Sequence, residues 1–118
     1  MPNEIASSQE KRILVFKLDV ESENFEEMSN TGELQIQNLL NHYRILLFVD
    51  HEHSRIYIWE GSEVTTRMKF LSAQLAPNIR DQYGIDYSIT TVDDGDETLD
   101  FKKFLSIKED AEKEVNNI

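Results

Sequence analysis

Two neighbouring segments are apolar on both faces of an extended strand, and this property restricts the fold more than any other feature of the sequence. In residues 43–49, alternate side chains are apolar in both directions: Ile45, Leu47 and Val49 on one face, Leu46 and Phe48 on the other. In residues 55–59, Tyr57 and Trp59 alternate with Ile56 and Ile58 in the same way. A strand of this kind lies in the interior of a sheet and needs a cover on each side.

The segment between these two strands predicts how they pair. Residues 50–54 (Asp-His-Glu-His-Ser) are polar and form a short turn, so the two strands should make an antiparallel hairpin. Apolar and β-branched side chains dominate residues 13–18 and 87–92, and both segments are predicted to be strands as well.

The segment after the first strand has a less regular pattern. Residues 21–30 hold four glutamates and little apolar content, which predicts a loop with one helical turn at 25–28. Residues 33–37 fit a short strand, whereas residues 32–42 fit a helix. The apolar spacing leaves both alternatives open.

Two amphipathic segments are the candidates for the two covers of the sheet. Residues 62–83 carry one apolar stripe with spacings of three and four residues: Val64, Met68, Leu71, Leu75, Ile79 and Tyr83. Ser62 is the expected N-cap of this long helix, and Gly84 is its expected stop signal. A shorter helix is predicted over residues 97–107, with these side chains on one side: Phe101, Phe104 and Leu105.

Pro77 lies inside the predicted long helix. A proline in a regular helix interior removes a backbone hydrogen bond and costs about 3 kcal/mol. Either the helix kinks near residues 73–76, or it ends there and a second short helix starts with Pro77 in its first turn. Because the apolar stripe continues in phase to Tyr83, we expect one kinked helix.

The predicted strands and helices combine into an α+β sandwich, in which a sheet lies between one long and one short α-helix. We expect a single domain over residues 12–107, because a chain of 118 residues suffices for one hydrophobic core. Residues 1–11 are polar and are expected to form a disordered N-terminal segment. Residues 108–118 are expected to form a charged C-terminal tail that frays.

Charge and composition exclude several classes of function. A formal net charge of −11 opposes binding to nucleic acid or to an acidic membrane surface. The chain has no cysteine, which excludes disulfides and thiolate metal sites. It has neither an apolar stretch long enough to cross a bilayer nor a secretory signal, so we expect a cytoplasmic protein. We also expect the chain to be a monomer by itself. No phosphate loop, nucleophile elbow or helical metal-ligand pair is visible, and we expect no enzymatic activity.

Two polar turns hold candidate metal ligands. His51 and His53 flank Glu52, and two imidazoles with this spacing can bind a transition metal. A tight site needs three or more fixed ligands, so a solvated turn is the expected state. Four acids lie in a second turn and do not follow the spacing of the twelve-residue calcium loop: Asp93, Asp94, Asp96 and Glu97. These acids are expected to complement the dipole of the helix that follows.

Three motifs follow one another in a fixed order between residues 54 and 104. They are tyrosine-x-tryptophan-x-glycine, glycine-x-glutamate and phenylalanine-x-x-phenylalanine, carried by Tyr57, Trp59 and Gly61, by Gly95 and Glu97, and by Phe101 and Phe104. In order and spacing these motifs resemble the gelsolin/villin/severin repeat. The resemblance implies a gelsolin-like fold, related to the ADF-homology fold, with a central mixed β-sheet sandwiched between one long and one short α-helix.

The same resemblance implies a function. Many gelsolin-like repeats bind actin through the long helix, which lies in the groove between actin subdomains. We therefore expect a cytoskeleton-associated protein that binds actin or an actin homologue and regulates filament assembly. A single repeat is expected to sequester actin or to control nucleation, since severing and capping in this family generally need several linked repeats. A non-actin protein-interaction module of the same fold is the alternative.

The long helix also supplies the candidate partner-binding residues. Those outside its core stripe are Arg67, Phe70, Gln74, Asn78 and Asp81. By helical angle Phe70 lies well away from the core stripe, and an exposed aromatic side chain is a typical anchor for a partner. The alternatives are that Phe70 is a lone exposed aromatic side chain without a partner-binding role, or that the N-terminal segment covers it.

Family members often use calcium, bound by a glycine–aspartate pair before the central strand and by a glutamate of the long helix. In this sequence Leu40 and Asn41 match the pair, and Met68 matches the glutamate. Glu63 is the acid in the first turn of the predicted helix. The usual ligands are therefore not intact, and oxygen ligands remain at Asn41 and Glu63. This departure predicts actin binding without calcium, or a rearranged calcium site.

Overall fold

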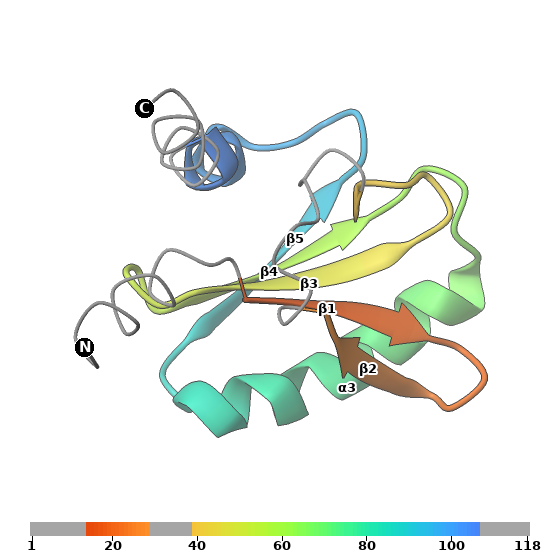
Figure 1. The fold of residues 1–118 in the computed structure, drawn as a ribbon, viewed down its shortest axis with the longest axis horizontal. Helices are drawn as coiled ribbons and strands as arrows, with labels where there is room; N and C mark the ends of the chain where they lie inside the picture. Colours follow the sequence, from red (N-terminus) through yellow and green to blue (C-terminus); the bar gives the residue numbers. More distant parts are fainter. Residues whose placement is uncertain (1–13, 29–38, 107–118) are drawn as a thin grey trace, which may run out of the picture.

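The computed structural model describes residues 14–28 and 39–106, and its centre is a five-stranded β-sheet (Figure 1). The strands are β1 (Leu14–Asp19), β2 (Asn24–Glu27), β3 (Ile45–Asp50), β4 (Arg55–Glu60) and β5 (Ser88–Asp93). Their order across the sheet is β2-β1-β3-β4-β5. β5 pairs parallel with β4, and the other neighbours pair antiparallel, so the sheet is mixed, as the resemblance implies.

β3 and β4 occupy the interior of the sheet because their side chains are apolar in both directions. Every residue of β3 is buried, and so are the four central residues of β4. The core accordingly divides into two clusters, which lie on opposite faces of the sheet. β3 contributes Leu46 and Phe48 to one cluster and Ile45, Leu47 and Val49 to the other. The predicted antiparallel hairpin with two apolar faces is confirmed.

The long helix, α3 (Thr66–Tyr83), covers one face of the sheet and lies below the strands in Figure 1. Its buried side chains are Leu71, Ser72, Ala76 and Ile79. Pro77 lies within this one helix, so the alternative of two separate helices is wrong. Gly84 ends the helix, as predicted, by donating its backbone N–H to the carbonyl oxygen of Arg80.

The first turn of α3 begins later than predicted. Thr65, rather than Ser62, is the N-cap, and its hydroxyl accepts a hydrogen bond from the backbone N–H of Met68. The residues before Thr65 are bonded to the loop that precedes β3, since Gly61 donates its N–H to the carbonyl oxygen of Arg44. The contact between Gly61 and Arg44 therefore holds residues 61–64 outside the helix, and the helix begins after Thr65 instead of after Ser62.

Gly61 lies at a close approach of two chain segments. A β-carbon at this position would lie 2.2 Å from the carbonyl oxygen of His42, so a larger residue would require the backbone to move. The same oxygen accepts a hydrogen bond from the backbone N–H of Glu63. The tyrosine-x-tryptophan-x-glycine motif thus ends in glycine for a steric reason.

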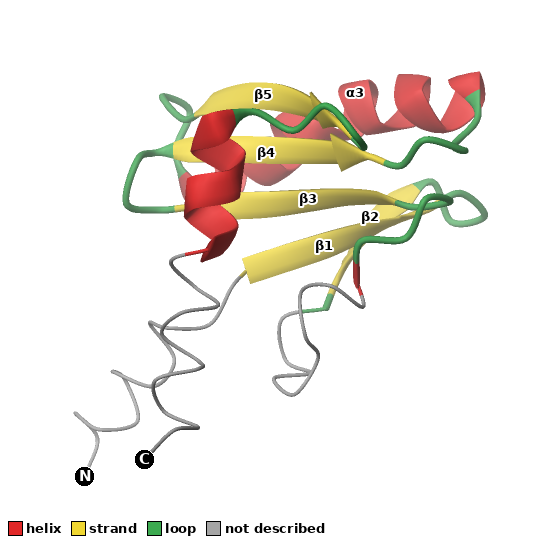
Figure 2. Ribbon diagram, turned by 90° about the horizontal axis from the view of Figure 1, so that it is seen from above, coloured by secondary structure: helices red, strands yellow, loops and turns green. Residues whose placement is uncertain are grey.

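A short helix begins at residue 99, is described as far as residue 106 and covers the other face of the sheet (Figure 2). Phe101 and Phe104 are buried, and both pack edge-on against Phe48, with ring centroids 5.6 and 6.2 Å apart. The indole N–H of Trp59 donates to the carboxylate of Glu97 at 3.0 Å, which ties the end of β4 to the turn before this helix. The predicted sandwich of one sheet between a long and a short helix is confirmed.

The prediction of a loop over residues 21–30 is wrong, because Asn24–Glu27 forms strand β2, and no helical turn forms there. β2 is an edge strand paired with β1. An edge strand needs only one inward side chain, and Phe25 supplies it while the other three residues are exposed. Glutamates on an edge strand oppose pairing with other chains, so the acidic composition marks an edge rather than a loop.

Some predictions concern parts of the chain outside the described residues. These are the disordered segment over residues 1–11, the tail over 108–118, and most of the strand-or-helix alternatives over 32–42. Among the described helices, none is long and apolar enough to cross a membrane.

Candidate partner-binding surface

The exposed face of α3 carries all five candidate partner-binding residues. Arg67, Phe70, Gln74, Asn78 and Asp81 lie three or four residues apart, a spacing that places them along one face of a helix. Each of the five is exposed, whereas the opposite face of α3 packs on the sheet. The structure therefore brings these residues together on one continuous surface, which we call the α3 surface.

Phe70 is the single large apolar side chain that α3 exposes. Its exposed fraction is 62%. Among the described residues, no segment covers the ring. The alternative of cover by the N-terminal segment concerns residues outside the described part of the chain. Burial of such a side chain against a partner would contribute roughly 2 kcal/mol from the hydrophobic effect.

An ion pair extends the α3 surface onto the turn between β1 and β2. A guanidinium nitrogen of Arg67 lies 2.8 Å from a carboxylate oxygen of Glu23, and both side chains are more than half exposed. Glu23 has a φ of +53°, a conformation that its turn between two strands requires. Local sequence patterns do not predict this contact, because the two residues are 44 positions apart.

The remaining residues of the α3 surface are polar. Gln74 and Asn78 present uncharged amide groups, which can donate and accept hydrogen bonds at once. Asp81 forms an exposed ion pair with Arg80 at 3.1 Å. The surface therefore has an aromatic ring and two amides between a cation near one end of the helix and an anion near the other.

The positions that match the family's calcium ligands have other contacts here. The side-chain oxygen of Asn41 accepts a hydrogen bond from the backbone N–H of Tyr43 at 2.8 Å. Met68 packs, partly buried, in the core cluster under α3. Glu63 is exposed, and its backbone bond to His42 brings its turn next to the turn of Asn41. Asn41 and Glu63 are thus on adjacent turns, while Met68 belongs to the core.

The acidic turn after β5 makes specific bonds that its sequence did not predict. The carboxylate of Asp94 pairs with His42 and also accepts the backbone N–H of Ser62. The hydrogen bond with Asp94 raises the pKa of His42, and the same bond is the main cause that lowers the pKa of Asp94. This group, which we call the His42–Asp94 junction, joins three loops at one end of the sheet.

Glu97 has a second specific role in that turn. Burial alone would raise its pKa, but the hydrogen bonds from Trp59, from its own backbone and from Gly95 hold the pKa below the usual value. These bonds connect the strand motif with the turn motif. Asp94 and Glu97 therefore stabilise the contacts between loops, and they also lie near the start of the short helix.

The two histidines of the β3–β4 turn do not converge on one site. His51 hydrogen-bonds through Nδ1 to the hydroxyl of Tyr87 at 3.1 Å, and its ring packs against that of Tyr83. His53 instead pairs through Nδ1 with the carboxylate of Asp50 at 2.9 Å. A metal site built on both imidazoles is therefore not formed.

Comparison with known proteins found likeness in structure only. No protein-family model matches the sequence, and no curated protein matches it. The crystal structure of the Thorarchaeota ProGel/rabbit actin complex matches with a TM-score of 0.67 and 22% sequence identity, over 79% of this chain and 98% of that chain. The crystal structure of the Thorarchaeota 2DGel3/rabbit actin complex matches with a TM-score of 0.58 and 23% identity, over 77% of this chain and 44% of that chain.

These matches agree with the motifs and with the observed architecture. The motifs at residues 57–61 and 95–104 predict a gelsolin-like domain, and the mixed sheet between one long and one short helix has that arrangement. In fold, the chain is a single gelsolin-like domain.

Proposed function

We propose that this chain is an actin-binding protein, rather than an enzyme, and that it holds actin or an actin homologue against the α3 surface. The observation that carries the proposal is the exposed ring of Phe70, in the middle of a helix whose opposite face is buried. Binding energy in protein interfaces concentrates in a few aromatic or arginine anchors surrounded by polar residues. Phe70 and Arg67, together with the amides of Gln74 and Asn78, match that composition.

The structural neighbours support actin as the partner. The two structures named above, of Thorarchaeota ProGel and of 2DGel3, are complexes with rabbit actin. The match to ProGel extends over nearly that whole chain, so a domain of this size can be compared with it directly.

We further propose that the protein regulates filament assembly in the cytoplasm by sequestering monomers or by controlling nucleation. One α3 surface gives one contact with one actin subunit, which is enough to withdraw a monomer but provides no second contact to grip a filament. Binding is expected to proceed without calcium, because Met68 packs in the core and the side chain of Asn41 is bonded to its own turn.

The test is the polymerisation of fluorescently labelled actin with the protein added, once with calcium and once with a chelator. We expect slower assembly in both conditions. Phe70→Ala should weaken binding by at least about tenfold and leave the free energy of unfolding within about 0.5 kcal/mol of the parent value. Leu99→Ala is the matched control, since Leu99 is 65% exposed but lies on the short helix, across the sheet from α3.

The possible results separate the proposals. Loss of the effect in Phe70→Ala and its retention in Leu99→Ala would support actin binding through α3. An effect that needs calcium would contradict calcium independence. A folded protein without any effect on actin would point to the alternative, an interaction module with a different protein partner.

A further inference from the structure

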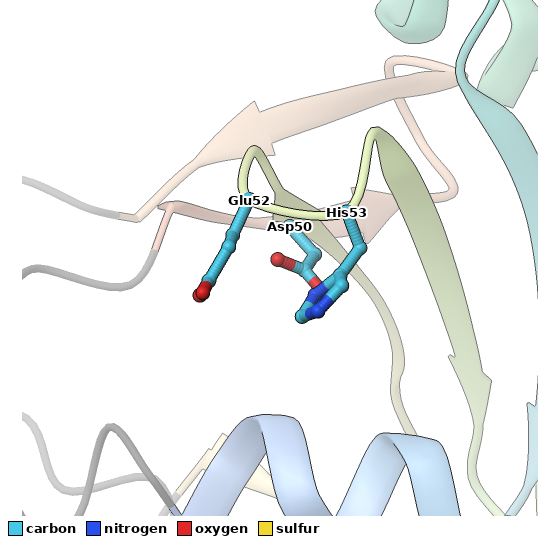
Figure 3. Close-up of side chains that lie close together, drawn as sticks. All are labelled: Asp50, Glu52 and His53. Atoms are coloured by element: carbon cyan, nitrogen blue, oxygen red, sulfur yellow. The ribbon is translucent and has the colours of Figure 1, made fainter.

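The end of the β3–β4 hairpin gathers three side chains that are all potential metal ligands. Asp50, Glu52 and His53 each offer one ligand atom, and these atoms lie within 4.8 Å of one another. In the described part of the chain this is the one such group of three or more histidine and acidic residues. Figure 3 shows the three side chains on the same side of the hairpin, the side that faces the short helix.

Two of the three ligand atoms already lie close together, and a small outward rotation of the imidazole would bring them to the separation that a metal site requires. Zinc binds histidine nitrogen and carboxylate oxygen at about 2.0–2.2 Å, so two ligands of a tetrahedral site lie roughly 3.4 Å apart. The Nδ1 atom of His53 lies 2.9 Å from a carboxylate oxygen of Asp50. Glu52 is exposed, and rotation of its side chain can bring its carboxylate to the same distance.

The position of Asp50 is fixed by the fold. It is the last residue of β3, pairs with Arg55 across the hairpin and is only 5% exposed, although it carries a carboxylate. The turn is tied down as well, since Ser54 donates its N–H to His51 and accepts the N–H of Ser88. A buried carboxylate on a fixed turn is a suitable metal ligand, because little conformational freedom is lost when the ion binds.

The surroundings leave room for an ion and favour a cation. The three ligands lie on the wall of a hollow of about 300 Å³, which is also lined by Tyr57 and Phe104. Arg55, another lining residue, donates to Asp100 at 3.2 Å, so these two charges offset each other. The charged side chains that remain in the hollow are the two carboxylates of Asp50 and Glu52 and the ammonium group of Lys103. Negative charge therefore exceeds positive charge there.

We propose that Asp50, Glu52 and His53 bind a divalent transition-metal ion, for which zinc is the probe. The nitrogen ligand favours zinc over calcium and magnesium, which prefer oxygen ligands alone. Three protein ligands leave a fourth position for water, as in open zinc sites. This site lies on the face of the sheet opposite α3, so the proposal is independent of actin binding.

The test is isothermal titration calorimetry of the full chain, without an affinity tag and freed of metal, with zinc chloride and in parallel with calcium chloride. We expect one zinc ion per chain and no calcium binding. At free zinc of about a hundred times Kd, the Tm should rise by roughly 10 °C, because the ion binds only the folded state.

Three substitutions assign the ligands. His53→Gln and Glu52→Gln should each weaken zinc binding by at least about tenfold. His51→Gln is the matched control, since it removes a neighbouring exposed imidazole that contacts Tyr83 and Tyr87 instead, and it should leave zinc affinity unchanged. Circular dichroism without metal checks that each variant is folded. Absence of zinc binding in the parent protein, calcium binding in its place, or equal affinity in His53→Gln and the parent would overturn the proposal.

Discussion

His42 shows how a single residue, through its backbone and its side chain, can connect several loops of this small domain. Its carbonyl oxygen accepts the backbone N–H of Glu63, and its imidazole pairs with Asp94, which in turn accepts the N–H of Ser62. One residue thereby connects the loop before β3, the turn before α3 and the turn after β5. Gly61 permits this arrangement because any β-carbon there would collide with the carbonyl oxygen of His42.

The His42–Asp94 junction predicts a pH dependence of stability. The pKa of His42 is raised above its usual value of 6.5 by the hydrogen bond with Asp94, so the folded state binds the proton more tightly than the unfolded state. The contribution is fully present below pH 6.5 and is lost as the pH rises through the raised pKa. We therefore expect the Tm difference between the parent and His42→Gln to be largest near pH 6 and to shrink above it.

Thermal unfolding of both proteins at half-unit pH steps from about 5.5 to 8.5 measures this difference. Asp94 does not distort the comparison, since its lowered pKa affects stability only in acid, where its own contribution falls away. A Tm difference that stays constant or grows with pH would show that the imidazole is not protonated in the junction.

At the scale of helices and strands, the sequence predicts the elements with a regular pattern of apolar residues. It misses the features that depend on contacts between segments far apart in the chain. β3 and β4 were predictable because they are short apolar runs on either side of a polar turn, and α3 because its apolar residues recur every three or four positions. β2 was not, since an edge strand buries only Phe25. The N-cap at Thr65 was missed because contacts with the loop before β3 hold the residues ahead of it.

The candidate binding residues were likewise predictable only in part. The helical period predicts the line of exposed residues that includes Phe70. It cannot predict that Glu23 reaches Arg67 from another element, or that His53 turns towards Asp50 while His51 turns towards Tyr87. Such contacts depend on the register of the sheet, which local spacing does not encode.

The short helix gives a prediction at this scale. Phe101 is fully buried against Phe48 and Tyr57, so Phe101→Ala should lower the free energy of unfolding by about 3–4 kcal/mol. Leu99→Ala, on the exposed side of the same helix, should change it by less than about 0.5 kcal/mol. Urea unfolding measures both, and similar losses in the two variants would mean that the helix does not cover the sheet as described.

At the scale of the whole molecule, the two faces of the sheet carry different structural features. α3 covers one face of the sheet and exposes Phe70, while the short helix covers the other and lines the hollow beside Asp50. The two core clusters share no residue, since alternate side chains of the same strands supply them. Side chains on one face can therefore change without altering the packing on the other.

This separation predicts that core substitutions on opposite faces are additive. Ile79→Val removes buried apolar atoms from the cluster under α3, and Phe104→Leu removes them from the cluster under the short helix. Each substitution should lower the free energy of unfolding by roughly 1 kcal/mol. The double variant should lose the sum within about 0.5 kcal/mol, because the two sites have no shared partner. Urea unfolding of all four proteins measures the coupling, provided that the m-value stays constant. A larger coupling energy would show that strain passes through the sheet, and binding at the α3 surface would then be expected to alter the hollow on the far face.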